Sequence, residues 1–262
     1  MKLIDSHCHL THKRIRKDLD AVLQRARQAG LIHIVCAAGN LPESAAACEL
    51  AQTTDGLTFM SGTHPHDAKD VAADHLQQLR ELAANPKHIA IGEIGLDYHY
   101  DFSPRDVQQT VFAEQLALAA KLGKPVAIHS REAWEDTARI LREANIPGDN
   151  LLLHCCTEPA ENVREALDMG MSISFSGAVT FKNADPLRLA AKLVPNDRLL
   201  IETDAPFMSP EPVRKMRPNE PSNVRHVCTC LADLYGMKPA RLAEITSENV
   251  RRFFNLPDEQ ML

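Results

Sequence analysis

The sequence has few aromatic residues, no long apolar run and no excess of positive charge. Aromatic residues make up 5% of the 262 residues, which gives only weak support to a base-stacking platform. No apolar run reaches the length of a membrane span, so we expect no membrane association. The formal net charge of −6 at pH 7 excludes a protein that coats nucleic acid non-specifically. Any nucleic-acid substrate would therefore need a local site.

The seven cysteines include no Cys-x-x-Cys pair. The closest pairs, Cys155-Cys156 and Cys228-x-Cys230, do not resemble a zinc ribbon. The first residues, MKLIDSHCHL, lack the apolar core of a signal peptide. Because free thiols are typical of reducing compartments, these features predict a cytoplasmic protein.

Short apolar runs alternate with helix-like segments along the whole chain. The runs span residues 2–7, 31–38, 57–62, 88–93, 125–130, 151–156, 171–177 and 198–204. They are continuous rather than alternating, as expected for strands of a parallel sheet that are buried on both faces. Segments of helical period lie between them, at 43–52, 103–123, 131–145, 161–170 and 186–194. In the segment 103–123 we expect Ser103 as the N-cap, Asp106 completing a capping box, and Gly123 at the end.

Eight strand candidates interleaved with helices favour an α/β fold, a single (β/α)8 TIM barrel that spans residues 1–262 as one domain. A doubly wound open sheet is the alternative, but no glycine-rich nucleotide turn follows the first run. Residues 204–221 form a long proline-rich and basic loop, and the tail from about 220 to 256 predicts helices that cover the barrel.

Polar residues follow most of the apolar runs, where a barrel carries its chemistry. They are His7, His9, His64, Glu93, His129, His154 and Asp204. In a regular strand Asp5, His7 and His9 would share one face and Cys8 would point the other way. One such histidine means little, but several imidazoles and two carboxylates at separate strand ends predict a metal site.

The donor set is informative about the metal. Four of these imidazoles and the two carboxylates suffice for two ions that each keep an open position. A set of nitrogen and oxygen donors without cysteine suits Zn, Mn, Ni or Fe, and Mg or Mn where phosphates and waters complete the sphere. Glu93 lies mid-circle, where it can bridge the two ions. Such a pair activates water for attack on a phosphoryl or carbonyl group.

Motifs along nearly the whole chain carry a resemblance to one family. They are DSHCH, GTHPHD, IGEIGLDYH, PVAIHSREA, LLLHCCTE, SFSGAVTF, LLIETDAPF and RPNEP, in that order. The sequence resembles the TatD family of metal-dependent hydrolases, within the amidohydrolase-like barrels. The resemblance implies a TIM barrel with its active site at the C-terminal ends of the strands, and deoxyribonuclease activity, commonly of the 3′ to 5′ exonuclease kind.

The resemblance also assigns roles to residues. It implies one ion held by His7, His9 and Asp204, a second held by His129 and His154, and Glu93 as the bridge. Asp204 would also orient the water and take its proton, and His64 would reach the scissile phosphate or the leaving group. One departure is Cys156, where many relatives carry phenylalanine, and we expect it to alter local packing or substrate fit rather than metal binding.

Further polar residues have two interpretations each. Asp5 and Glu202 are expected to be buried acids that support the site rather than ligands. Arg131 either grips a substrate phosphate or pairs with Asp97, which the pattern places in a loop after Glu93.

Residues at the expected mouth are also candidates for contact with a substrate. Arg214, Lys215 and Arg217 either face solvent or track a nucleic-acid backbone. Stacking on bases is possible for Phe102, Phe207 and Trp134, although a tryptophan on a helix is more often core.

Three functions remain open. The leading one is a hydrolase that uses two divalent ions (Mg, Mn or Zn) to cleave single-stranded DNA or 3′ ends. A second keeps the same site but cleaves an ester or amide, as a D-aminoacyl-tRNA deacylase does, because ligands report the mechanism and loops the substrate. The third is a non-catalytic interaction protein, which the complete ligand set disfavours. We expect no obligate protein partner.

Overall fold

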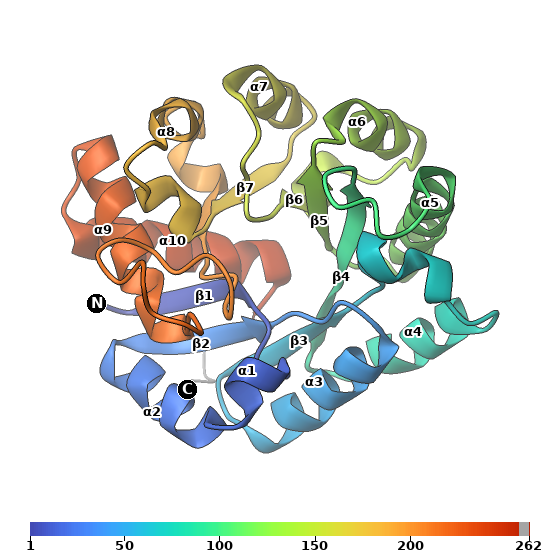
Figure 1. The fold of residues 1–262 in the computed structure, drawn as a ribbon, viewed down its shortest axis with the longest axis horizontal. Coiled ribbons are helices and arrows are strands. Elements are labelled where there is room, and N and C mark those ends of the chain that lie inside the picture. The colour runs from blue at the N-terminus through green and yellow to red at the C-terminus, as the bar shows by residue number, and fades with distance from the viewer. Residues whose placement is uncertain (257–261) are drawn as a thin grey trace.

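Eight parallel strands follow one another around a barrel in chain order, in a computed structural model that describes residues 1–256 and 262 (Figure 1). The strands are β1 (Leu3–Cys8), β2 (Leu31–Cys36), β3 (Leu57–Ser61), β4 (His88–Asp97), β5 (Val126–Arg131), β6 (Leu151–Leu153), β7 (Ser172–Phe175) and β8 (Leu199–Ile201). Each strand pairs in parallel with the next. The predicted (β/α)8 barrel is therefore confirmed.

Hydrogen bonds between the first and last strands close the ring. The backbone N–H of Asp204, just after β8, donates to the carbonyl of His7 at 3.0 Å. The Ser6 hydroxyl donates to the carbonyl of Ile201, also at 3.0 Å. This seam brings residues from the two ends of the chain together at the C-terminal rim of the barrel.

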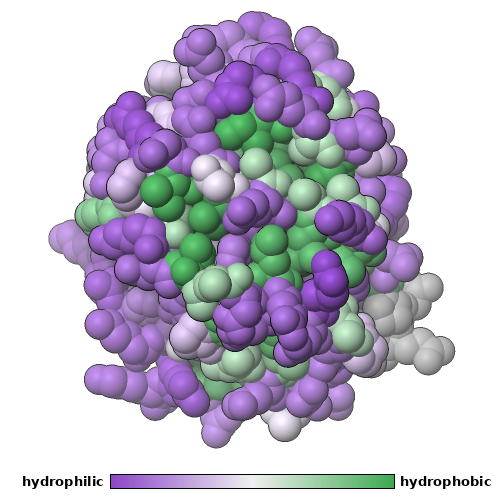
Figure 2. All heavy atoms as spheres, turned by 90° about the vertical axis from the view of Figure 1, so that its right-hand side faces the viewer, coloured by the Kyte–Doolittle hydropathy of each residue, from purple (hydrophilic) through white to green (hydrophobic). Residues whose placement is uncertain are grey.

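Helices surround the barrel as an outer layer. They are α1 (Lys13–Arg16), α2 (Leu19–Gln28), α3 (Leu41–Thr53), α4 (His75–Ala83), α5 (Arg105–Leu122), α6 (Trp134–Glu143), α7 (Ala160–Asp168), α8 (Asp185–Ala191), α9 (Val224–Tyr235) and α10 (Pro239–Phe254). Hydrophilic residues dominate the face shown in Figure 2, with hydrophobic patches between them, as expected for a helical layer against water. None of the described helices is long and apolar enough to cross a membrane.

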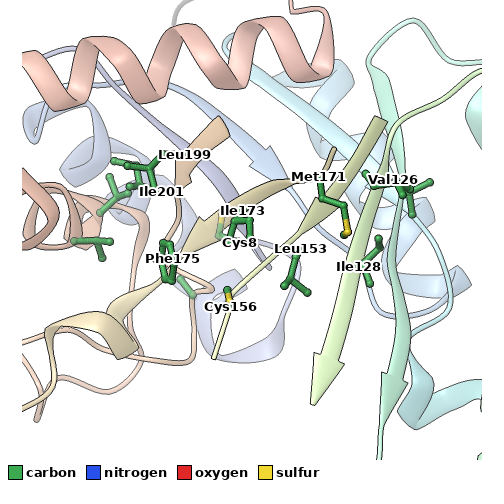
Figure 3. Packing of buried hydrophobic residues seen from close by; sticks show 14 of the residues in the cluster. Cys8, Val126, Ile128, Leu153, Cys156, Met171, Ile173, Phe175, Leu199 and Ile201 are labelled. Atoms are coloured by element: carbon green, nitrogen blue, oxygen red, sulfur yellow. The ribbon is translucent and has the colours of Figure 1, made fainter. Parts of the chain in front are cut away.

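Alternate strand residues divide the core into two layers. Outward residues of neighbouring strands pack with the helices, and Figure 3 labels members of this layer such as Val126, Ile128, Leu153, Ile173 and Ile201. The residues between them point into the barrel, where Ala127, Leu152 and Leu200 pack with Val250 and Phe253 of α10. Helix α10 thus closes the N-terminal end of the barrel, which confirms the predicted covering role of the tail and leaves the C-terminal rim for polar side chains.

The start of α5 differs from the prediction. Ser103 is not its N-cap, since its hydroxyl instead donates to the carbonyl of His66 and accepts from the N–H of Lys69. Pro104 caps the helix without a side-chain bond. Gly123 ends the helix as predicted, with a φ of 61° that favours glycine.

Strand β4 is longer than predicted. It continues past Glu93 to Asp97, so Asp97 lies on the strand and not in a loop over the rim. Strands β6 and β8 are instead shorter, so that His154 and Asp204 follow the last paired residues of their strands.

Candidate metal centre

The inward periodicity of the strands carries polar residues to the rim. Ala127 and Leu152 point into the barrel, and two residues further on the next inward positions are His129 and His154. Glu202 follows the inward Leu200 in the same way. The apolar interior of the barrel therefore ends in a layer of imidazoles and carboxylates.

Glu93 reaches this layer through an irregularity in β4. Between Ile91 and Ile94 the strand advances three residues while its partner β5 advances two, from Val126 to Ile128. The extra residue on β4 interrupts the alternation, and such bulges re-aim side chains beside active sites. Glu93 is 4% exposed and lies at the centre of the histidine cluster.

A similar irregularity in β1 overturns one expectation. Asp5 pairs with Ile34 and Cys8 with Cys36, so β1 gains one residue between them. Asp5 therefore does not share a face with His7 and His9. Its carboxylate accepts hydrogen bonds from the N–H of Thr203 at 2.9 Å and from the Thr203 hydroxyl at 2.5 Å. Asp5 thus joins β1 to the end of β8, and complete burial raises its pKa to about 8.

The two oxygens of Glu93 face two different sets of imidazoles. Oε2 lies 3.5 Å from His7 Nε2 and 3.4 Å from His9 Nε2. Oε1 lies 2.7 Å from His154 Nε2 and 2.9 Å from His129 Nδ1. One carboxylate therefore stands between two groups of nitrogen donors, as a ligand shared by two ions would.

Asp204 belongs to the Oε2 side. Its Oδ1 lies 3.5 Å from His9 Nε2, and the ligand atoms of His7, His9 and Asp204 lie within 4.8 Å of one another. The Asp204 backbone has a φ of 52°, a left-handed conformation that aspartate tolerates better than most residues. Its Oδ2 accepts a weak bond from the Cys155 thiol at 3.7 Å.

The surroundings of His7 test whether a metal fits. His7 is fully buried, and within the described part of the chain neither of its ring nitrogens makes a hydrogen bond. Its ring stacks on that of His154 with centroids 4.0 Å apart. A buried polar group without a partner costs about 1–3 kcal/mol. An ion beside Glu93 would occupy one lone pair of His7, so the donors present fit a metal.

Two carboxylates hold the candidate ligands from behind. Asp97 Oδ2 lies 3.1 Å from His129 Nε2 and 2.9 Å from His66 Nε2. Glu202 Oε1 lies 3.3 Å from His154 Nδ1, and its other oxygen accepts from the Ser174 hydroxyl. A carboxylate on the far nitrogen fixes which nitrogen of a histidine is free for the metal.

The expected alternative pairing of Asp97 with Arg131 is wrong, because Asp97 is fully engaged elsewhere. Its Oδ1 accepts from the N–H groups of His99 and Tyr100. The supporting role of Asp97 was missed in the sequence. The available signal was its position four residues after Glu93, which puts both on one side of an extended strand.

Positive charge is drawn into the site by its acids. Burial alone would raise the pKa of Glu93, but the charges of the surrounding histidines, above all His154, hold it well below its usual range. Burial lowers the pKa of His9, yet its hydrogen bonds to Asp204 and Glu93 raise it to about 10. In the absence of metal, protons on imidazoles neutralise the carboxylates, which is the charge that divalent ions would replace.

His64 faces the same carboxylate from the β3 side. Its Nε2 lies 3.5 Å from Glu93 Oε1, and its Nδ1 accepts the N–H of His66 at 3.1 Å. Burial lowers its pKa to about 4, so the ring is neutral. Because Nδ1 accepts a hydrogen bond, Nε2 carries the proton and points it into the site.

Residues at the rim show different degrees of exposure. The guanidinium carbon of Arg131 lies 4.9 Å from the ring centroid of Tyr100. Phe102 and Phe207 are 55% and 43% exposed. Trp134 is buried and donates from its indole nitrogen to Glu165, so it is not free to stack on a base.

The family is decided by comparison with known proteins. The family model described as "TatD related DNase" matches residues 4–255. The chain belongs to the TatD-related DNase family. An uncharacterized metal-dependent hydrolase of Bacillus subtilis, YabD, is 42% identical over 254 residues, covering 97% of this chain and 99% of the relative. A 3′-5′ ssDNA/RNA exonuclease TatD of Erwinia tasmaniensis is 38% identical and covers 97% of this chain and 100% of its own.

A solved structure agrees with this assignment. The crystal structure of YJJV, a TatD homologue of Escherichia coli, superimposes with a TM-score of 0.91 at 30% identity, covering 97% of this chain and 98% of the other. This member of the TatD family is therefore a metal-dependent hydrolase with candidate ligands in place. Cys156 is buried in the outer core layer (Figure 3), and its effect on packing or substrate fit stays a prediction.

Proposed function

We propose that this TatD-family chain is a two-metal phosphodiesterase that removes nucleotides from single-stranded DNA, with the 3′ to 5′ direction. One observation carries the proposal: the Glu93 carboxylate directs each of its oxygens at a separate set of imidazoles. Two ions that share such a ligand form a site suited to hydrolysis of phosphodiesters.

The proposed ligands divide between the two ions. They are His7, His9 and Asp204 for one, His129 and His154 for the other, and Glu93 for both. When bound, the two ions (Mg, Mn or Zn) would activate a water and neutralise charge on the scissile phosphate. The Asp204 side chain is 15% exposed, more than that of Glu93 at 6%, so it stands where a water can reach it. Asp204 would orient that water and accept its proton.

Two further residues would act on the substrate. The Nε2–H of His64 points towards Glu93 and is placed to donate to a phosphoryl or leaving oxygen. Among the described residues Arg131 has no carboxylate in an ion pair, and Asp97 is committed to histidines. Its guanidinium is therefore available to bind a substrate phosphate at the rim.

The names of two relatives support single-stranded DNA as the substrate, and the unpaired cysteines support a cytoplasmic location. The Erwinia tasmaniensis relative and one from Klebsiella pneumoniae are both named 3′-5′ ssDNA/RNA exonuclease. All seven cysteines are unpaired, which suits the reducing cytoplasm.

The test is digestion of 5′-labelled single-stranded DNA by wild-type protein and Asp204→Asn, with Mg, Mn or Zn and with EDTA. We expect stepwise shortening from the 3′ end that needs both metal and Asp204. A parallel assay on D-aminoacyl-tRNA examines the ester alternative. Hydrolysis of the aminoacyl ester with intact DNA would overturn the proposed substrate.

A further inference from the structure

A basic cleft lies beside the rim, between α1 and the loop that follows β8. It is lined by Lys13, Arg14 and Lys17 on one side and by Arg217 and Pro218 on the other, and encloses about 640 Å³. The two walls come from opposite ends of the chain. In Figure 1 the orange loop after β8 lies in front of β1 and β2, on the side of the blue segment that carries α1.

The charge of this cleft is not neutralised locally. Its four cations are exposed, and within the described residues none of them forms an ion pair. The acids that adjoin the cleft in sequence are engaged by another residue, because Arg25 lies 3.4 Å from Asp18 and 2.8 Å from Glu220. In a chain of net charge −6, the cleft is a local concentration of positive charge.

A short chain of side chains links the cleft to the metal centre. His12 caps α1, its Nδ1 accepting the N–H of Arg14 at 3.1 Å, and its ring packs edge-on against Phe207 with centroids 5.5 Å apart. Phe207 in turn packs against the candidate ligand His9, with centroids 6.0 Å apart. The partly exposed Phe207 ring therefore stands between the reacting centre and the cations.

We propose that the basic cleft binds the sugar-phosphate backbone of the same strand whose end is hydrolysed, with Phe207 against one of its bases. The inference rests on the proposed function, since it assigns a binding surface to the substrate of that site. A polyanion gains affinity from unpaired cations, and an exposed ring beside them accepts any base, so the surface suits single strands without sequence preference. Because the Phe207 ring lies between His9 and His12, we expect a substrate with only one phosphodiester at the metal centre not to reach the cleft.

The cleft therefore predicts a dependence on strand length. A small diester such as bis(p-nitrophenyl) phosphate reaches only the metal centre. An oligonucleotide of roughly 20 nucleotides also reaches the cleft and should be a better substrate than a dinucleotide. The gain from length should vanish when the cleft loses its charge, whereas hydrolysis of the small diester should not change.

The experiment compares two variants with the same change in net charge. The cleft variant replaces four residues by glutamine: Lys13→Gln, Arg14→Gln, Lys17→Gln and Arg217→Gln. The control replaces four exposed cations of the outer helical layer, three on helices and Lys192 at the C-cap of α8: Arg80→Gln, Lys121→Gln, Arg164→Gln and Lys192→Gln. We expect the cleft variant to lose at least tenfold in kcat/KM on the long oligonucleotide. Each phosphate contact with a single strand contributes roughly 0.7 to the steepness of log affinity plotted against log salt concentration. Loss of four such contacts should therefore make this slope less steep by about 3.

The outcomes separate the inference from the function on which it rests. Suppose that wild-type protein cleaves the long strand and that the cleft and control variants have equal kcat/KM on it. This result would overturn the proposed role of the cleft in strand binding and leave the proposed function intact. If wild-type protein cleaves no single strand, the function falls, and binding of a labelled strand then decides the cleft: equal binding by both variants overturns it. Hydrolysis of the small diester shows that each variant is folded. We expect each of the double variants Lys13→Gln/Arg14→Gln and Lys17→Gln/Arg217→Gln to lose part of the kcat/KM on the long oligonucleotide.

Discussion

Replacing Asp97 by asparagine should weaken the binding of one metal ion while the barrel stays folded. Asp97 Oδ1 accepts from two backbone N–H groups, those of His99 at 3.1 Å and Tyr100 at 2.9 Å. Asparagine has a single side-chain oxygen, and these two donors would hold it in the Oδ1 position. The amide NH2 group would then face His129 Nε2, which lies 3.1 Å from Asp97 Oδ2.

This exchange changes the tautomer of His129. With aspartate, Nε2 carries a proton, and Nδ1, which lies 2.9 Å from Glu93 Oε1, is free to bind an ion once its own proton leaves. With asparagine, Nε2 must accept a hydrogen bond, so the remaining proton moves to Nδ1. Binding through Nδ1 would then force two N–H groups to face each other, an unmade hydrogen bond that costs about 1–3 kcal/mol. That range corresponds to a dissociation constant raised about 5- to 150-fold, which includes the roughly 10- to 100-fold loss typical of removing such a partner.

Calorimetric titration of metal-free protein with Mn or Zn measures the effect. We expect two binding steps in wild-type protein and a dissociation constant raised roughly 10- to 100-fold for one of them in Asp97→Asn. The control is Asp101→Asn, because Asp101 is a more exposed acid on the following loop that pairs with Arg105. Asp97→Asn that binds both ions as tightly as the control would refute the reasoning.

Three other perturbations test separate parts of the account. Glu93→Gln removes the shared anionic ligand, so metal analysis should find at most one tightly bound ion per chain; two ions held as in wild type would contradict the bridge. Gln115→Ala removes buried hydrogen bonds to the N–H and carbonyl of Thr63, at 2.7 and 3.1 Å, and urea unfolding should show a loss of about 3 kcal/mol. Burial lowers the pKa of His88 from 6.5 to about 3. Below pH 6.5 the unfolded chain binds a proton at His88 that the folded chain does not. The contribution of His88 to the free energy of unfolding is therefore complete above pH 6.5 and falls by about 1.4 kcal/mol per pH unit below it. His88→Asn should lack this contribution. If the free energy of unfolding falls equally steeply with decreasing pH in both proteins, the contribution of His88 is excluded.

The rim location of the site could be predicted because regular periodicity governs most strands. His129 and His154 are the next inward positions after Ala127 and Leu152, and the sequence pattern sufficed to place them together. The family resemblance added the division between two ions. Neither source required knowledge of side-chain contacts.

Irregular backbone defeated the prediction elsewhere. The extra residue in β1 turns Asp5 away from His7 and His9, contrary to the expectation that the three share one face. Bulges depend on pairing with the neighbouring strand, which a single sequence does not display. A contact distant in sequence likewise explains Ser103, whose hydroxyl donates to the carbonyl of His66 and accepts the N–H of Lys69 instead of capping its own helix.

The central claim is that Glu93 is shared by two ions, and anomalous diffraction from crystals soaked in Mn tests it most directly. The account predicts two peaks, one beside His7, His9 and Asp204 and one beside His129 and His154, with the Glu93 carboxylate between them. A single peak at saturating Mn, or two peaks with Glu93 bound to only one, would contradict it.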